Sequence, residues 1–198
     1  MSSALVECVI LIGLPGAGKS SLYREKFAST HVHVSKDLWP NATKREERQR
    51  EMIEEALGAG RSVVIDNTNP TIAERAALIR LARVHGARVI GYFFDVNTRT
   101  AVARNAERTG RGKVPNVAIF TAAKRLQHPS LAEGFDQLFR VEIAKRLFIG
   151  SFGFGGTARS RDQGKQSETG DKCWSYERCH ALIETSTSFS RQLFSAWE

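Results

Sequence analysis

Near its start the chain carries a glycine-rich segment whose spacing suits the binding of a phosphate chain. Residues 13–20 read Gly-Leu-Pro-Gly-Ala-Gly-Lys-Ser, the pattern G-x-x-x-x-G-K-[ST] of a P-loop. The glycines let backbone N–H groups converge on a phosphate, Lys19 supplies a cation for the β- and γ-phosphates, and the Ser20 hydroxyl can ligate Mg²⁺. The alternative is a glycine-rich turn without a ligand. The residues predicted to contact the nucleotide here are Gly13, Pro15, Gly16, Ala17, Gly18, Lys19, Ser20 and Ser21.

Two aspartates stand just after apolar runs, where a magnesium ligand or a catalytic base would be placed. Asp66 ends the run Ser62–Asp66, and in P-loop proteins an acid at this place lies beside the Mg²⁺ of the nucleotide. Asp37 follows the short run His31–Val34. Because ligands of open α/β sheets bind at the carboxyl ends of the strands, Asp37 should border the phosphates and could accept a proton from an attacking hydroxyl. The alternatives are a turn-capping aspartate at 66 and a helix N-cap at 37.

A helix-like segment further along the chain carries two arginines on one face. Arg104 and Arg108 are four positions apart, and residues at this spacing meet on a helix surface. The loop Thr109–Asn116 follows and is rich in glycine and basic residues. This pattern predicts a lid over the phosphates, whose arginines would stabilise the charge on a phosphoryl group in transfer. Both arginines are therefore predicted to bind the nucleotide, and Arg108 also to act in catalysis.

Alternating strand-like and helix-like segments must position these side chains. The predicted strands are Leu5–Ile12, His31–Val34, Ser62–Asp66, Ala87–Phe94 and Leu138–Ile143. The predicted helices are Lys19–Phe27, Lys44–Leu57, Ile72–Val84, Thr98–Glu107 and Val117–Leu126. Such alternation is typical of an α/β protein with a parallel sheet. Since the P-loop follows the first strand, we expect a P-loop NTPase three-layer α/β/α sandwich with a mostly parallel central sheet and a kinase-type helical lid.

Hydrophobic periodicity and charge divide the 198 residues into two parts. Residues 1–149 hold the periodic segments and are predicted to form one domain, whereas residues 150–198 are predicted to be a low-complexity, flexible tail. The net charge of +8 belongs to the first part, because the tail has equal numbers of basic and acidic residues. A basic cluster suits a polyanion such as a nucleotide or nucleic acid; the alternative is a solvated helix surface. Its members are Arg99, Arg104, Arg108, Arg111, Lys113, Lys124 and Arg125.

Cysteine usage and hydropathy indicate an intracellular protein. Cys8 lies in the first predicted strand, and Cys173 and Cys179 have no partners at zinc-like spacing, so we expect no structural metal. An odd number of cysteines in a reducing compartment needs no disulfide. No apolar run approaches the roughly 20 residues of a membrane span, and we expect neither a signal peptide nor membrane contact. The predicted location is the cytoplasm or the nucleus.

The segments named above resemble the 5′-hydroxyl-kinase domain of the polynucleotide kinases. That group includes the phage enzyme, the polynucleotide kinase/phosphatase of animals and fungi, and related bacterial P-loop kinase-like ATPases. The matching segments are Gly13–Ser21, Lys36-Asp37, Ile65–Pro70, Arg104-Asn105-x-x-Arg108 with Val114-Pro115, and Leu131–Phe135. Ile65–Pro70 and Leu131–Phe135 are more diagnostic than the P-loop. The resemblance spans residues 5–149 and leaves the tail unmatched.

The resemblance implies a P-loop kinase domain over residues 1–149, with ATP and Mg²⁺ as cofactors. It gives Asp37 the role of general base for the acceptor hydroxyl. It assigns Lys19 and Ser20 to ATP and Mg²⁺, and Asp66 to a place near the metal and the acceptor. These roles agree with the ones that the residues themselves indicate.

The resemblance also makes Arg104 and Arg108 lid arginines that engage the phosphate chain. Two positions depart from the family pattern. Lys36 precedes the predicted base where an arginine is common, and Pro40 stands where the phage enzyme has the arginine that contacts the acceptor phosphate. The departures concern nucleic-acid binding more than phosphoryl transfer.

Three functions are compatible with these patterns. The first is a kinase that uses Mg²⁺ and ATP to phosphorylate a hydroxyl, most plausibly the 5′-hydroxyl of DNA or RNA, as in nucleic-acid end repair. The second is a small-metabolite kinase, because the fold does not determine the acceptor. The third is a nucleotide-binding module with weak ATPase activity and a protein partner, unnamed by the sequence, held by the tail. The basic lid favours the first over the second, and Asp37 favours either kinase over the third.

Overall fold

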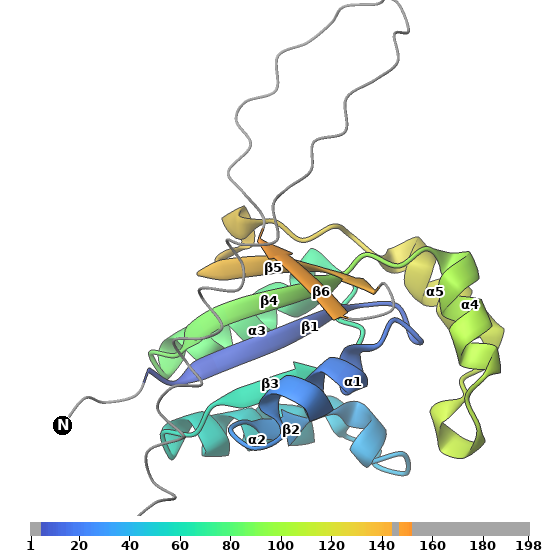
Figure 1. Ribbon diagram of the computed structural model, residues 1–198. Coiled ribbons are helices and arrows are strands. Elements are labelled where there is room, and N and C mark those ends of the chain that lie inside the picture. Colours follow the sequence, from blue (N-terminus) through green and yellow to red (C-terminus); the bar gives the residue numbers. More distant parts are fainter. Residues whose placement is uncertain (1–4, 144–146, 152–198) are drawn as a thin grey trace, which may run out of the picture. The chain divides into compact units, whose positions relative to one another are not determined.

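A computed structural model describes residues 5–143 and 147–151, all within one compact unit. A six-stranded sheet with the order β2-β3-β1-β4-β5-β6 forms its centre (Figure 1). Neighbouring strands run parallel from β2 through β5, and β6 pairs antiparallel with β5. The strands are β1 (Glu7–Gly13), β2 (Val32–Val34), β3 (Val63–Asp66), β4 (Arg88–Phe94), β5 (Gln137–Ile143) and β6 (Leu147–Ser151). The predicted, mostly parallel sheet is confirmed, with each predicted strand end within two residues of the observed one.

Helices connect the strands much as the hydrophobic periodicity predicts. The long helices are α2 (Arg45–Gly58), α3 (Ile72–Val84), α4 (Thr98–Ala106) and α5 (Asn116–Arg125). The first predicted helix is divided into a short α-helix, α1 (Lys19–Leu22), and a π-helical turn, η1 (Tyr23–Phe27). Thr71 and Asn97 begin α3 and α4 as N-caps, each accepting a backbone hydrogen bond in its side-chain oxygen. None of the helices in the described part of the chain is long and apolar enough to cross a membrane.

The sheet buries both of its faces, which explains why its strands read as continuous apolar runs. Successive residues of β1 point to opposite faces, so Cys8, Ile10 and Ile12 pack on one side and Val9 and Leu11 on the other. The first side is covered by apolar residues of α2 and α3. The second is covered by Leu22 of α1 and the aromatic rings of η1. Helices on both faces make the predicted three-layer sandwich.

One strand, β6, was not among the predicted elements. Its five residues lack a clear alternation of polar and apolar side chains, and its strand conformation depends on pairing with β5. The predicted tail, 150–198, lies outside the described residues from position 152 onward.

Candidate active site

The glycine loop joins β1 to α1 and is built in a backbone conformation that few other residues adopt. Gly13, Gly16 and Gly18 have φ angles of +144°, +85° and +92°. A Cβ atom on Gly16 would lie 2.6 Å from the carbonyl oxygen of Ala101 in α4. Glycine is therefore required by the backbone conformation at all three positions, and at Gly16 also by the close approach of α4.

Lys19 lies buried under this loop, and its ammonium is the centre of the site. The Nζ atom donates hydrogen bonds to the carbonyl oxygens of Gly13 at 2.9 Å and Leu14 at 2.8 Å. Burial lowers the pKa of Lys19 to about 8; the negative charges of Asp66 and Asp37 oppose this shift, and the positive charge of Arg108 adds to it. The predicted metal ligand, base and lid arginine thus all lie within electrostatic range of one ammonium.

Asp66 ends β3 next to the glycine loop and is 5% exposed. Its Oδ2 lies 3.1 Å from Nε2 of His33, and the Ser20 hydroxyl helps to lower the pKa of the Asp66 carboxyl. Burial alone would raise the pKa of Asp66, but the contacts with His33 and Ser20 and the charge of Lys19 outweigh it and hold that pKa below its usual value. The carboxylate is therefore ionised at neutral pH.

This pairing of a hydroxyl with an ionised carboxylate fits a magnesium ion. Mg²⁺ in nucleotide sites takes one or two protein oxygens and completes its octahedron with waters and phosphates. Ser20, at the end of the phosphate loop, and Asp66, at the end of β3, offer such a pair of oxygens. Within residues 5–143 and 147–151, no group of three or more His, Cys, Asp and Glu side chains is placed to hold a metal ion. The donor set fits Mg²⁺ bound together with a phosphate chain.

His33 is a member of this cluster that the sequence patterns did not single out. Its ring stacks on Tyr23 of η1, with centroids 4.0 Å apart and planes 11° from parallel, while Nε2 meets Asp66. The sequence offered one signal for this role, since His33 is a polar residue between two valines in a short apolar strand. Stacking fixes the ring, and the ring in turn orients the carboxylate.

Asp37 lies at the exposed surface in a single turn of 3₁₀-helix, η2 (Lys36–Leu38), directly after β2. Ser35 is the N-cap of this turn: its Oγ accepts from the Asp37 backbone N–H at 3.4 Å and donates to the backbone carbonyl of Asp66 at 2.8 Å. The N-cap alternative for Asp37 is therefore wrong. Ser35 links the segments that carry the two aspartates.

The segment after Asp66 is held on two sides by asparagine side chains. Asn67 accepts from the Lys36 N–H at 3.0 Å and donates to Gln49 of α2 at 2.8 Å. Asn69 adopts a positive φ of 43° and donates to the carbonyl oxygen of Leu11 in β1 at 2.7 Å. The two asparagines of the run from 65 to 70 thus fasten the metal-side loop to its neighbours on the sheet.

A buried ion pair explains why the segments 65–70 and 131–135 occur together. Arg75 of α3 is fully buried, and its guanidinium binds both carboxylate oxygens of Glu133, at 2.6 and 2.8 Å. The same guanidinium donates to the carbonyl oxygens of Asn69 and Pro70, each at 3.1 Å. Glu133 therefore acts through Arg75 on the loop that follows Asp66. Arg75 was missed in the sequence because its partner is 58 positions away.

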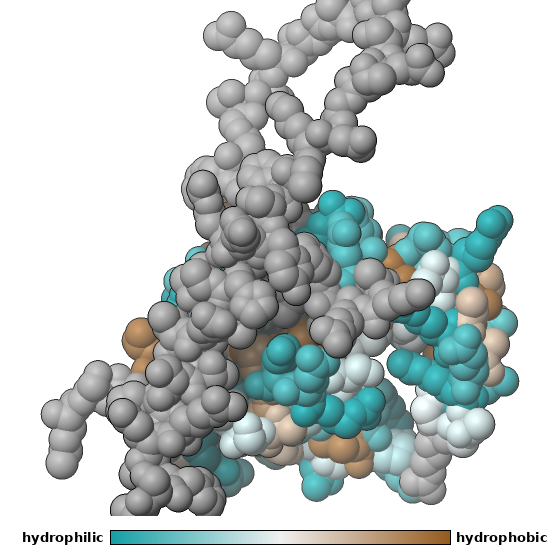
Figure 2. All heavy atoms as spheres, in the orientation of Figure 1, coloured by the Kyte–Doolittle hydropathy of each residue, from teal (hydrophilic) through white to brown (hydrophobic). Residues whose placement is uncertain are grey.

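The helices α4 and α5 pack against each other and against the glycine loop, with Leu14, Ala101 and Ile119 at their contact. Asn105 is fully buried, donates to the carbonyl of Val114 at 2.7 Å, and accepts from its N–H at 3.0 Å. These bonds close the loop that follows α4. Figure 2 shows hydrophilic residues over much of this helix pair, at the right of the view.

The structure brings the predicted site residues together at one edge of the sheet. Arg108 follows α4, donates to the carbonyl oxygen of Gly112 at 3.3 Å, and is close enough to Lys19 to lower its pKa. Arg104, four positions earlier, is half-buried. Arg108 is thus near the loop that it was predicted to cover.

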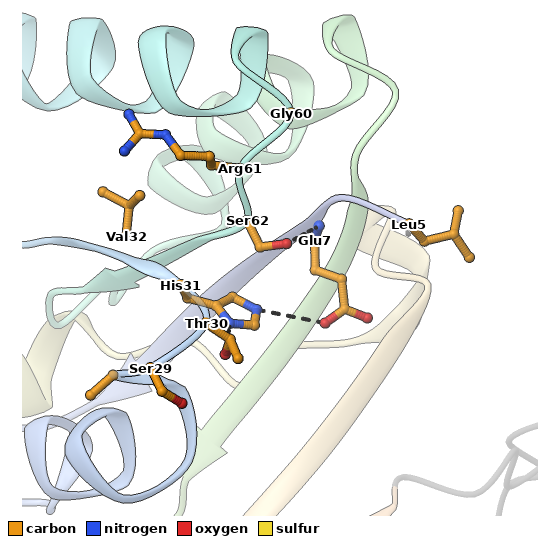
Figure 3. Close-up of a pocket in the computed structure, with 10 residues that line it drawn as sticks. Leu5, Glu7, Ser29, Thr30, His31, Val32, Gly60, Arg61 and Ser62 are labelled. Carbon is orange, nitrogen blue, oxygen red and sulfur yellow. Dashed lines mark hydrogen bonds and ion pairs between the residues drawn. The ribbon is translucent and has the colours of Figure 1, made fainter. Parts of the chain in front are cut away.

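An open pocket lies at the opposite, amino-terminal edge of the sheet (Figure 3). Its walls include Glu7, Thr30, His31 and Ser62, residues that begin strands or precede them. His31 Nε2 lies 3.6 Å from a Glu7 carboxylate oxygen, and contact with His31 holds the pKa of Glu7 below its usual value. None of the predicted site residues lines this pocket, so it is separate from the candidate active site.

Known proteins share both the sequence pattern and the fold. A family model described as "AAA domain" matches residues 8–129. The bifunctional polynucleotide phosphatase/kinase of Schizosaccharomyces pombe (strain 972 / ATCC 24843) is 30% identical over 139 residues, covering 68% of this chain and 33% of that protein. A fungal RNA kinase matches with a TM-score of 0.56 and 15% identity, over 70% of this chain and 39% of the other. A gluconokinase from Sinorhizobium meliloti 1021 matches with a TM-score of 0.53 and 19% identity, over 71% of this chain and 84% of the gluconokinase chain.

These likenesses differ in what they establish. The two solved structures share the fold, and they do not distinguish a nucleic-acid acceptor from a sugar acid. The chain spans about a third of the length of the curated relatives that it matches. The family model, in contrast, covers more than half of this chain and includes the glycine loop, Asp37, Asp66 and both lid arginines. The chain belongs to the AAA domain family and carries its P-loop kinase fold.

Proposed function

We propose that this protein transfers the γ-phosphate of ATP to the 5′-hydroxyl of DNA or RNA, with Mg²⁺ as its metal. The observation that carries the proposal is the buried Lys19 under the glycine loop, with Asp66 at the end of β3 and Asp37 in the turn after β2, two segments that Ser35 joins. Phosphoryl transfer needs little covalent chemistry from a protein, and these residue types are the ones that position and neutralise a phosphate chain.

On the donor side, the glycine loop surrounds the β- and γ-phosphates and Lys19 exchanges its two carbonyl partners for phosphate oxygens. Ser20 and Asp66 would hold Mg²⁺, which when bound would neutralise charge on the phosphates. Arg108 approaches from the end of α4 and stabilises the charge of the phosphoryl group in transfer, with Arg104 on the same side.

On the acceptor side, Asp37 accepts the proton of the attacking hydroxyl. Its turn is exposed, so a polymer end can reach it, and Ser35 fixes the turn relative to Asp66. A carboxylate in this role contributes about 10²- to 10⁴-fold to the rate. Electrostatic stabilisation by Lys19, the metal and Arg108 is expected to contribute more.

The name of the S. pombe relative, a bifunctional polynucleotide phosphatase/kinase, supports a polynucleotide as the acceptor. The gluconokinase fold leaves the small-metabolite alternative as an outcome of the test. The predicted low-complexity tail, 150–198, remains a proposal.

The test combines labelled ATP, Mg²⁺ and a 5′-hydroxyl oligonucleotide with the wild type and two variants. Asp37→Asn should lower kcat by about 10²- to 10⁴-fold and leave ATP affinity nearly unchanged. Lys19→Ala should abolish transfer to any acceptor. Asp136→Asn is the matched control, since Asp136 is an exposed residue that precedes β5 at the amino-terminal edge of the sheet, where it pairs with Arg83.

Each outcome decides between the functions. Label on the oligonucleotide that disappears in Asp37→Asn supports the proposal. Label on gluconate or another small hydroxyl compound, with none on the oligonucleotide, favours the metabolite kinase. ATP hydrolysis that Asp37→Asn leaves unchanged, with no labelled acceptor, would contradict both kinase readings.

A further inference from the structure

Two arginines lie beside the acceptor-side turn and take no part in the donor site. Arg45 and Arg48 belong to the first turns of α2, and residues three apart share a helix face. The same stretch of chain, from η2 into α2, contains the exposed Asp37. Cations at a helix start are unfavourable to the helix dipole, so helix stability does not account for this pair.

Arg45 is held against the segment that follows η2. Its side chain donates to the carbonyl oxygen of Pro40 and, through Nε, to that of Ala42 at 3.3 Å. Two backbone contacts restrict the guanidinium while leaving some of its five donors for another partner. The cation is therefore fixed near the turn of Asp37 without being neutralised by these contacts.

Arg48 is held by an aromatic ring. Its guanidinium carbon lies 5.0 Å from the ring centroid of Trp39, which is half-buried against the core on the α2 and α3 side of the sheet. A guanidinium that lies over an aromatic face keeps the hydrogen-bond donors at its edge available. Trp39 is thus a fixed platform that positions Arg48 at an exposed surface.

The lysines of the same stretch behave differently. Lys36 pairs with Glu46 at 3.0 Å, and Lys44 pairs with Glu47 at 2.9 Å. Among the described residues, Arg45 and Arg48 form no ion pair of this kind with a carboxylate. The carboxylates of Glu46 and Glu47 are thus paired with lysines rather than with Arg45 or Arg48.

We propose that Arg45 and Arg48 form a clamp for the backbone phosphates of the acceptor strand, with Trp39 as a positioning residue for Arg48. The inference rests on the proposed function and names its substrate class: a 5′-hydroxyl end followed by phosphodiesters, rather than a small uncharged alcohol. Arginine suits this task because its planar fork binds phosphate oxygens in pairs. The clamp lies on the chain next to Asp37 and brings the polymer end to the base.

The test measures KM for the acceptor and for ATP separately, in Arg45→Gln and Arg48→Gln. Loss of one charge-assisted phosphate contact should raise KM for a 5′-hydroxyl oligonucleotide by about 10-fold and leave KM for ATP unchanged. The slope of log KM against log salt should fall by about 0.7 for each arginine, as for single strands. Arg50→Gln is the matched control, because Arg50 is an exposed residue of the same helix and no part of the clamp.

Two further arms separate phosphate binding from a structural role. An oligonucleotide whose first two phosphodiesters are neutral methylphosphonates should bind the wild type as weakly as the normal oligonucleotide binds the variants, and the arginine variants should not weaken it further. Trp39→Ala should reproduce the Arg48→Gln result, whereas Trp39→Phe should restore much of the affinity.

An acceptor KM within twofold of wild type in both arginine variants would overturn the clamp, and so would equal losses on the charged and the neutral oligonucleotide. If those results occur while the wild type still labels the normal oligonucleotide, the proposed function stands and the clamp alone fails. If the wild type labels no oligonucleotide at all, both proposals fall together.

Discussion

The buried pair of Arg75 and Glu133 gives the sharpest stability prediction. The Arg75 side chain is 0% exposed and the Glu133 side chain 6%, so neither charge is solvated by bulk water. Glu133 accepts two hydrogen bonds from Arg75 and a third from the Ser130 backbone N–H at 3.0 Å. Truncating Glu133 therefore leaves a buried guanidinium with two carbonyl contacts as its remaining hydrogen-bond partners in the described chain.

We expect Glu133→Ala to lower the free energy of unfolding by about 3–5 kcal/mol, the usual cost of leaving one buried charge uncompensated. For a chain of this size the expected drop in Tm is roughly 6–20 °C. Urea denaturation followed by circular dichroism measures the loss. Arg125→Ala is the control, since its pair with Glu74 is half-exposed and should contribute at most about 1 kcal/mol.

The double variant Arg75→Met with Glu133→Ala tests the cause. Because it removes the orphaned charge, it should lose less stability than the two single variants added together. The reasoning is refuted if Glu133→Ala costs no more than Arg125→Ala, or if the single losses simply add. Either result would mean that water or another group solvates the guanidinium.

Three more outcomes are expected. Gly16→Ala should lose nucleotide affinity in calorimetry and more stability than Gly60→Ala, because both have positive φ but a Cβ meets a carbonyl only at Gly16; equal losses would contradict the close approach of α4. Asn105→Ala should cost about 1–3 kcal/mol and raise KM for ATP, since two buried bonds to Val114 are lost; an unchanged KM would disconnect this loop from the nucleotide. Glu7→Gln should be less stable than wild type at pH 7, and the difference should shrink in urea titrations as pH falls below 4.5, because the folded pKa of Glu7 lies under that unfolded value and the stabilising ionised form is lost; a constant difference down to pH 3 would be inconsistent with this linkage.

Local patterns predicted the elements well because they depend on neighbours along the chain. The apolar run of β1 and the 3.6-residue period of α3 were read with their ends nearly correct. The glycine loop could be predicted for the same reason, since its three glycines with positive φ and its lysine all belong to one segment of eight residues. The predicted Mg²⁺ ligands, Ser20 and Asp66, lie after β1 and at the end of the neighbouring strand β3, and their role stays a prediction.

Residue types and spacing determined that a phosphate loop, two aspartates and two lid arginines follow particular strands and helices. Only the tertiary structure decided which of them meet, because contacts across the sheet depend on the strand order β2-β3-β1-β4 rather than on chain distance. It brought His33 to Asp66 and Glu133 to Arg75, and it held Arg45 against the carbonyls after Asp37. Such pairs join distant segments or depend on a local turn, so the hydrophobic periodicity of the sequence does not predict them.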